Sequence, residues 1–559
     1  MADNWKHAGL RKREAIQALI PPEWLLPSPP APLEAVDLTD GVIQRYLSPR
    51  EVTITETGAL ALLQKLSTGE WSSREVTRAF CHRAALAHQM ISCLHEIFFE
   101  AALQDAEQCD RYLARHGRPI GPLHGLPVSL KDVVHVKDVA TSMGFLGWLD
   151  HTYASDDESE IVKILRSLGA VLYVKSAVPT GSFTGETFNS IIGYVPNPRN
   201  RFLTVGGSSG GEGGLLALKG SPLGIGTDIG GSVRVPAVWN GLYGLRPSTG
   251  RIPLRGVASV VDGQFMIPFV VGFMAPSPEV LTFATRSVLD AQPWVRDPAV
   301  VPMPWRADLH SEALQRAKGL SEPMCFGVMM SDGHVNPQPP VCRAMETVIG
   351  IIKALGHTRK TVSTDGGKAF HDALGSSGEP SNRVDLDLCG PPRTSSTVFG
   401  LKAGRQANAT EINGINLEVQ KYRTAYLEYW HSTAVITGTG RAVDALIMPV
   451  SPGSAPEPGK VRYFGYTTVV NVLDYTSCAV PVGTVDKAVD QYPDELYEPL
   501  NDLDRLVHDD YNAEAYHGAP VGAQIVGQRL EEEKVLALAE AIGDELHKRT
   551  GCLHLGSKL

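Results

Sequence analysis

Two glycine-rich stretches lie close together in this chain, and they constrain its fold more than any other feature. The first reads Thr-Val-Gly-Gly-Ser-Ser-Gly-Gly-Glu-Gly-Gly over residues 204–214, and the second reads Gly-Ile-Gly-Thr-Asp-Ile-Gly-Gly-Ser-Val-Arg-Val-Pro over residues 224–236. Glycine adopts positive φ without steric cost and lets backbone N–H groups approach a ligand closely. Successive N–H groups that point into one concavity form an anion-binding nest. The run from Ile229 to Ser232 therefore predicts a nest that ends in a hydroxyl. Acyl transfer needs N–H donors of this kind to hold its oxyanion.

Four other interpretations of these glycines are possible. Tight turns and close helix–sheet contacts would explain the glycines alone equally well. The spacing does not fit a dinucleotide fingerprint, and no Gly-Lys-Ser/Thr of a P-loop follows. The pattern Gly206-x-Ser208-x-Gly210 matches the nucleophile elbow of α/β-hydrolases. An elbow follows a buried strand, however, and residues 197–203 are too polar to form one.

A third segment places a lysine after an apolar run. Residues 121–132 read Gly-Pro-Leu-His-Gly-Leu-Pro-Val-Ser-Leu-Lys-Asp, and the alternation from Leu126 predicts a strand that ends near Lys131. Together the three segments resemble the amidase signature family, from about residue 50 to about residue 548. Within that family the likeness is strongest to fungal acetamidases. The segments that carry this likeness are residues 141–144, 206–212 and 515–520.

The resemblance implies both a fold and a triad. The fold is α/β, a three-layer α/β/α sandwich with a large mixed central sheet. The triad consists of a lysine, a serine on a cis peptide bond and a nucleophilic serine, which fall on Lys131, Ser208 and Ser232. Lys131 would take a proton through Ser208, Ser232 would attack the carbonyl, and water would then cleave the acyl-serine. The N–H groups that would hold the oxyanion fall on Ile229, Gly230, Gly231 and Ser232.

A lysine can act as a base only when it is neutral, which requires burial or nearby positive potential. We expect burial behind the apolar strand to lower the pKa of Lys131, and Asp132 must then point elsewhere. No histidine–acid pair stands at a recognisable spacing, and His124 and His517 are expected to be structural.

Residues around the nest and the pocket receive weaker predictions. Thr227, Asp228 and Arg234 flank the nest, either as its supports or as ordinary turn and salt-bridge residues, with equal weight. The resemblance places Met143 and Ser182 in the substrate-binding wall, where their identity does not fix the acyl group.

The leading hypothesis is hydrolysis of a carboxylic amide to an acid and ammonia or an amine, on small aliphatic or aryl amides. Short acyl groups are favoured by the likeness to acetamidases. A carbamate or ester hydrolase on the same triad is the alternative, because the acyl-serine chemistry is shared. A non-catalytic binding protein with a vestigial amidase fold is a third hypothesis. A serine esterase of the α/β-hydrolase type would need an essential histidine.

The length of the chain bears on its domain organisation. A chain of 559 residues suggests two or more domains, whereas the resemblance favours one domain over residues 51–559. Residues 1–50 would form a helical extension and a linker.

The net charge of −10 without a basic block argues against nucleic acid as a partner. We expect a small-molecule amide as partner and no membrane span, and leave a homodimer open. The longest apolar run, residues 265–275, is too short to cross a bilayer and predicts a buried strand.

Cysteines and the chain termini bear on the compartment. The eight cysteines show no paired spacing, which predicts buried thiols in a reducing compartment, and we expect no metal site and no cofactor. The first residues lack a signal-peptide pattern. The last three residues, Ser557-Lys558-Leu559, match a peroxisomal address. We therefore expect a peroxisomal protein, with the cytoplasm as the alternative, and no secretion.

Periodicity and capping signals predict the remaining elements. Helices are expected over residues 5–20, from Leu60 to Gly69, from the capping box Ser72-x-x-Glu75 onward, from Ala102 to Gly117, and over 161–168 and 341–355. The apolar repeat Leu60, Leu63 and Leu66 predicts the buried face of the second of these helices. Strands are expected over residues 171–175, 324–330 and 445–449.

Two segments depart from the family pattern. Residues 360–412 are rich in Gly, Ser, Pro and Asp, which predicts a shortened loop or disorder. Val271-Gly272-Phe273 stands where relatives commonly have Val-Gly-Pro, with an effect that the sequence does not reveal.

Overall fold

The structure is a computed structural model, and it describes residues 4–153, 157–261, 263, 266–362, 408–492 and 497–550. Residues 557–559 and most of the segment 360–412 lie outside the described residues. The predictions for the peroxisomal address and for a shortened loop or disorder fall on these parts of the chain.

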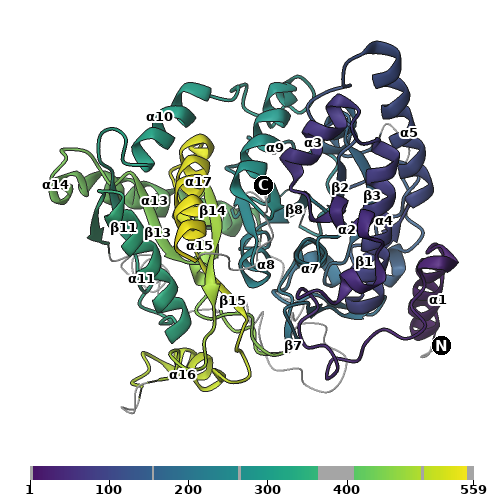
Figure 1. Cartoon of the computed structure of the whole chain (residues 1–559). Coiled ribbons are helices and arrows are strands. Elements are labelled where there is room, and N and C mark those ends of the chain that lie inside the picture. Colours follow the sequence, from purple (N-terminus) through teal and green to yellow (C-terminus); the bar gives the residue numbers. More distant parts are fainter. Residues whose placement is uncertain are drawn as a thin grey trace.

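A large mixed sheet forms the centre of the protein (Figure 1). Within the described residues it has eleven strands. In spatial order they are β1 (Leu94–Ile97), β3 (Val171–Ser176), β2 (Pro127–Lys131), β8 (Gly224–Asp228), β10 (Val270–Ala275), β9 (Tyr243–Arg246), β14 (Ser477–Thr484), β15 (Pro520–Val526), β13 (Ala445–Pro449), β11 (Cys325–Val328) and β12 (Thr358–Thr361). The predicted large mixed sheet is confirmed.

Lys131 and the predicted nest lie where β2 and β8 end. β2 runs parallel to both β3 and β8, whereas β10, β9, β14, β15 and β13 follow in antiparallel pairs. Because β2 and β8 are parallel neighbours, their carboxyl ends meet at the same edge. All five residues of β2 are buried, since a parallel strand inside a sheet is covered on both faces.

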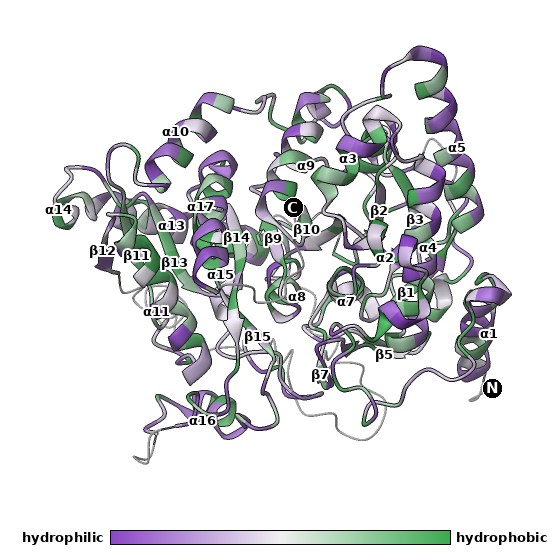
Figure 2. Ribbon diagram, viewed as in Figure 1, coloured by the Kyte–Doolittle hydropathy of each residue, from purple (hydrophilic) through white to green (hydrophobic). Residues whose placement is uncertain are grey.

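Helices cover both faces of the sheet, and β10 shows the division residue by residue. Met274 packs with Leu216 and Ala237 of α7 and α8, whereas Phe273 and Ala275 belong to the main hydrophobic core. Figure 2 shows hydrophobic residues concentrated on the strands, and hydrophilic residues along helices such as α5 and α10. The helices over residues 4–290 are α1 (Asn4–Ala18), α2 (Pro49–Glu56), α3 (Ala59–Thr68), α4 (Ser73–Ile91), α5 (Phe99–His116), α6 (Glu160–Ser167), α7 (Gly210–Ala217), α8 (Arg234–Trp239) and α9 (Pro278–Asp290). Those over residues 307–550 are α10 (Ala307–Ala317), α11 (Pro339–Ala354), α13 (Ala409–Ser432), α14 (Ala434–Thr437), α15 (Gly465–Leu473), α16 (Asp502–Asp509) and α17 (Glu532–Thr550).

The predicted helices and strands are present, with two local corrections. Leu60 was placed in the buried stripe of α3 but is 39% exposed, and Leu62 is buried instead. Ser72 caps α4 by accepting from the Glu75 N–H, but the Glu75 carboxylate pairs with Arg50 instead of returning to complete a capping box.

The N-terminal segment lies against the first half of the domain, and Figure 1 shows α1 beside β1. Ile16, Ile20 and Trp24 are buried, and Lys12 forms an ion pair with Glu96 at 2.6 Å. Trp24 stacks on His82 of α4 with ring centroids 4.8 Å apart. Ile16, Ile20 and Trp24 are thus part of the main hydrophobic core.

Six cysteines lie in the described residues, and all six are free thiols, five of them buried. No helix in the described ranges is both long and apolar enough to cross a membrane.

Candidate active site

Lys131 ends β2 inside the protein, and its side chain is fully buried. Its Nζ lies 2.7 Å from Ser208 Oγ, 2.9 Å from Thr227 Oγ1 and 3.4 Å from the Thr227 carbonyl oxygen. Burial lowers the pKa of Lys131 to about 7, although the carboxylates of Asp228 and Glu212 act against this change.

The three partners of Lys131 suit both protonation states of its amine. A neutral amine has two N–H donors and one lone pair. It can donate to both oxygens of Thr227 while it accepts the Ser208 hydroxyl proton. An ammonium group has three donors, and all three oxygens can then accept. A proton can therefore move between Ser208 and Lys131 without leaving a buried donor or acceptor unpaired.

Ser208 stands in the first glycine-rich stretch, just before α7, and the Gly207–Ser208 peptide bond is cis. A Cβ added at Gly207 would lie 2.5 Å from the Thr184 carbonyl oxygen, so only glycine fits there. The preceding segment does contain a strand, β7 (Asn200–Thr204), but it pairs with β6 (Pro196–Asn197) in a separate small sheet. Phe202 in β7 is 45% exposed, so Ser208 does not follow the buried strand of a nucleophile elbow.

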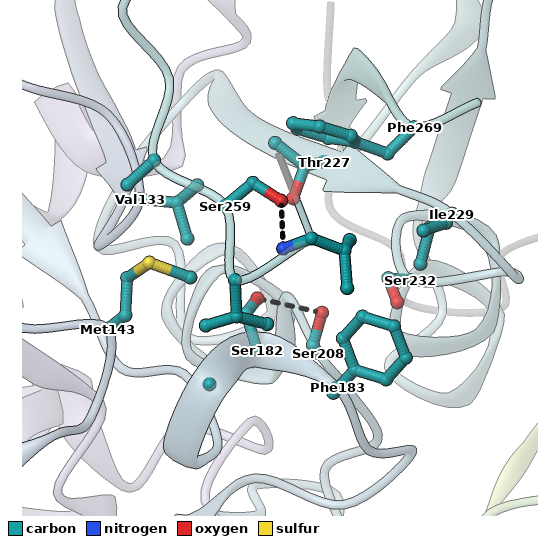
Figure 3. A pocket seen from close by; sticks show the side chains of 14 residues that line it. Val133, Met143, Ser182, Phe183, Ser208, Thr227, Ile229, Ser232, Ser259 and Phe269 are labelled. Atoms are coloured by element: carbon teal, nitrogen blue, oxygen red, sulfur yellow. Dashed lines mark hydrogen bonds between the residues drawn. The ribbon is translucent and has the colours of Figure 1, made fainter. Parts of the chain in front are cut away.

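Ser232 lies in the tight connection between β8 and α8 and is half-buried in the same pocket as Ser208 (Figure 3). Its carbonyl accepts from the Ser209 N–H at 3.1 Å, which links the two glycine-rich stretches. Of the four predicted oxyanion donors, the Gly231 N–H already donates to Asp228 Oδ1 at 2.9 Å. Among the described residues, the N–H groups of Ile229, Gly230 and Ser232 have no partner.

Asp228 organises this connection from inside the protein. It accepts from the Val233 N–H at 3.1 Å and is paired with Arg234 at 3.0 Å. Burial alone would raise its pKa, but the Arg234 guanidinium and hydrogen bonds from Arg234 and Asn471 hold the pKa of Asp228 well below its usual range. The other contacts of Arg234 are with Gln524, Thr467 and Asn471. Asp228 and Arg234 therefore hold the connection between β8 and α8 in place, which agrees with the predicted role as supports.

Asp132 faces away from Lys131, as expected. Its carboxylate forms an ion pair with Lys175 at 2.7 Å and a hydrogen bond with His95 at 2.8 Å. It also accepts from the backbone N–H groups of Ser142 and Met143, at 3.2 and 3.1 Å. Burial raises the pKa of Asp132, but Lys175 and His95 outweigh burial and hold it well below the usual range. This buried cluster anchors the loop that brings Met143 to the pocket.

Several of these supporting residues were missed by the sequence analysis. His95 and Asp132 form a histidine–acid pair that their spacing in the chain does not reveal, and neither residue lines the pocket. The two residues come from different strands, so their spacing in the chain gave no signal. Lys175 could have been noticed, since it is a charged residue next to the end of the apolar strand β3. His124 and His517 also lie outside the pocket lining, where each contacts a backbone group.

Glu212 is a second missed residue, and the one charged position in the first glycine-rich stretch. It is buried in α7 and accepts from Ser129 Oγ at 2.5 Å. Burial raises the pKa of Glu212 to about 7. Burial thus lowers the pKa of Lys131 and raises the pKa of Glu212, which brings the two values close together.

The pocket itself is a cavity of about 30 Å³, roughly two to three times the volume that a single water needs. Its walls are mainly apolar side chains and hydroxyls. They come from Val133, Met143, Gly181, Ser182, Phe183, Ser208, Thr227, Ile229, Ser232, Ala258, Ser259, Val260, Val261 and Phe269. The predicted wall residues Met143 and Ser182 are among them. Within the described ranges, no group of three or more His, Cys, Asp or Glu side chains could hold a metal ion.

Comparison with known proteins places this site in a family. The family model described as "Amidase" matches residues 75–536. An acetamidase from Emericella nidulans is 40% identical over 562 residues, covering 97% of this chain and 98% of the relative. An acetamidase from Aspergillus oryzae is 41% identical and covers the same shares of both chains.

Solved structures agree with this placement. A fatty acid amide hydrolase superposes with a TM-score of 0.84 at 30% identity, covering 98% of this chain and 95% of that one. A bacterial aryl acylamidase of the amidase signature family shares the fold, with a TM-score of 0.66 at 18% identity over 88% of this chain and 96% of that one. The chain belongs to the amidase signature family and is an amide hydrolase.

Proposed function

We propose that this enzyme hydrolyses small carboxylic amides through an acyl-serine intermediate on Ser232, with Ser208 and Lys131 as the proton relay. The observation that carries the proposal is the 2.7 Å contact between Lys131 and Ser208 beside Ser232 in one pocket. A serine hydroxyl needs such a positioned base to act as a nucleophile at neutral pH.

The proposed reaction uses the three side chains in turn. Ser232 Oγ attacks the amide carbon while its proton passes to Ser208 Oγ and the Ser208 proton passes to Lys131. We assign the oxyanion to the N–H groups of Ile229, Gly230, Gly231 and Ser232, with the Gly231 donor shared with Asp228. Loss of one such donor costs about 3 kcal/mol of transition-state stabilisation. The relay then runs backwards to protonate the leaving nitrogen, and water cleaves the acyl-serine.

The size of the pocket supports short acyl groups. The relatives differ in the amides that their names state, acetamide for one group and fatty acid amides for another. The cavity between the described walls is about 30 Å³, and Phe183 and Phe269 stand among these walls. We therefore propose that kcat/KM falls as the acyl chain lengthens beyond a few carbons.

A substrate panel tests this function. Purified enzyme would be assayed with acetamide, longer aliphatic amides, aryl amides and ethyl carbamate, together with Ser232→Ala as the control. We expect the highest kcat/KM on a short-chain amide and no turnover by Ser232→Ala. A preference for long-chain amides would refute the size argument. A preference for the carbamate would move the function to the alternative on the same triad.

The peroxisomal location remains a proposal that rests on Ser557-Lys558-Leu559. A fluorescent protein fused to the N-terminus should then appear in puncta that coincide with a peroxisomal marker. Deletion of residues 557–559 should make the signal diffuse. A diffuse signal from the intact fusion would show that the tripeptide is not read.

A further inference from the structure

Ser182 is a pocket residue whose hydroxyl points at the relay. Its Oγ donates to Ser208 Oγ at 3.1 Å, and Figure 3 shows this bond beside Ser232. We infer that Ser182 is a positioning residue, which fixes the direction in which Ser208 passes its proton. The inference rests on the proposed function of Lys131, Ser208 and Ser232.

A count of donors and lone pairs gives the reason. A serine hydroxyl has one proton and two lone pairs. In the productive arrangement Ser208 donates to neutral Lys131 and accepts from Ser232. The second lone pair is then free, and Ser182 occupies it. With both lone pairs filled by hydroxyl donors, the Ser208 proton must point at Lys131.

The same count explains why Ser182 disfavours the unproductive state. When Lys131 is an ammonium, it donates to Ser208 and takes one lone pair. Ser182 takes the other, so the Ser208 proton is turned away from Lys131. Ser208 Oγ then faces two donor protons, one of them from a cation, and the partial positive charge of the Ser182 hydroxyl proton opposes the charge on Lys131. The side chain therefore favours the neutral amine.

The backbone holds Ser182 where the hydroxyl is needed. Ser182 has φ of 57°, which is uncommon for a residue with a Cβ, and its neighbour Gly181 has φ of 71°. The Ser182 N–H donates to the Pro179 carbonyl, and the Gly181 N–H donates to the Met143 carbonyl, both at 2.8 Å. A sparsely populated conformation that the surroundings hold in place at a pocket is a reason to test for function.

Two substitutions separate the hydroxyl from the backbone. Ser182→Ala removes the hydroxyl and keeps the Cβ, whereas Ser182→Gly removes the hydroxyl and also fits the positive φ. Loss of one hydrogen bond of this kind should lower kcat roughly 3- to 10-fold. We expect the same fall in both variants, with KM changed less than twofold, and a larger loss on an amide than on a matched ester. The acid limb of the kcat/KM profile should move to higher pH by a few tenths.

Ser259→Ala is the comparison within the pocket. Ser259 also lines the cavity, but its Oγ accepts from the Val261 N–H and makes no hydrogen bond to Ser208 among the described residues, so the acid limb should stay in place. The inference is overturned if both Ser182 variants keep the wild-type kcat and acid limb, if only KM changes, or if Ser182→Gly keeps full activity while Ser182→Ala loses it. Activity in Ser232→Ala would instead refute the proposed function itself.

Discussion

At the scale of single residues, the chemistry depends on the charge of Lys131. A lysine with its ordinary pKa of about 10.4 would be neutral in fewer than about one molecule in a thousand at pH 7. Burial lowers the pKa of Lys131 to about 7, so the neutral amine is well populated at neutral pH. Holding the amine in this state costs roughly 4 to 5 kcal/mol at 1.36 kcal/mol per pKa unit.

The pH dependence follows from the neutral form being the active one. Activity should fall as the pH drops through about 7, because the base is then protonated. The folded state binds this proton more weakly than the unfolded chain, so its stability should also decrease as the pH falls from about 10.5 to about 7. Lys131→Met should remove the acid limb of kcat/KM and lose amide hydrolysis far more than ester hydrolysis. Equal losses on a matched amide and ester would show that Lys131 does not return the proton.

Glu212 should tune this ionisation from α7. Its negative charge opposes the lowering of the Lys131 pKa, so Glu212→Gln should move the acid limb of kcat/KM to lower pH. The amide keeps an oxygen that can accept from Ser129, which preserves the local shape. An unchanged or raised acid limb, in a variant with normal thermal unfolding, would contradict the coupling between the two groups.

Single residues were predictable where a local pattern carried them. Lys131, Ser208 and Ser232 stand in short motifs. The structure places Ser208 and Ser232 in one pocket, and Lys131 contacts Ser208 from inside the protein. Glu212 was overlooked because a lone acidic residue among glycines carries no signal in the sequence. Its burial depends on contacts with β2 and β8, which only the folded sheet brings together.

At the scale of elements, the end of β2 places two adjacent residues in different networks, Lys131 as the last residue of the strand and Asp132 just after it. Lys131 reaches the relay, while Asp132 joins Lys175 and His95 and anchors the loop that carries Met143. Successive side chains of a strand point to opposite faces, so one strand can serve both. The alternation predicted the strand and its last residue. It could not predict Lys175 as the partner, because that residue comes from β3.

The Asp132–Lys175 pair should be strongly coupled. Lys175→Met leaves a buried carboxylate without its cation and should destabilise the protein by about 3 to 5 kcal/mol. Asp132→Asn should also destabilise it. The double variant should cost clearly less than the two single changes together, because it leaves no unpaired charge. Denaturant unfolding of the four proteins measures this, and additive effects would show that the pair is not an energetic unit.

At the scale of the whole molecule, the N-terminal segment is part of the core. Residues 1–50 were expected to form an extension and a linker, and periodicity did predict α1. The burial of Trp24 could not be predicted, because its partners lie on α4 and α5, at His82 and Phe99. The extended proline-rich stretch between them in the chain gives no sign of such contacts.

Trp24 should therefore matter for stability although it lies far from Ser232 in the chain. Trp24→Ala should lower the free energy of unfolding by about 3 to 5 kcal/mol, as large-to-small changes in a core do. Leu33→Ala is the control in the same segment, since Leu33 is 85% exposed and its loss should cost less than about 0.5 kcal/mol. Similar values for the two variants would mean that the segment does not contribute to the core.

Labelling with a fluorophosphonate tests the central claim, that Ser232 is the nucleophile activated through Ser208 and Lys131. The wild-type enzyme would be inactivated with the reagent, digested, and the modified serine located by mass spectrometry. We expect modification of Ser232 alone, much slower labelling in Lys131→Met, and none in Ser232→Ala. A phosphonylated Ser208 or Ser209 in the wild-type enzyme, or full amide hydrolysis by Ser232→Ala, would contradict it.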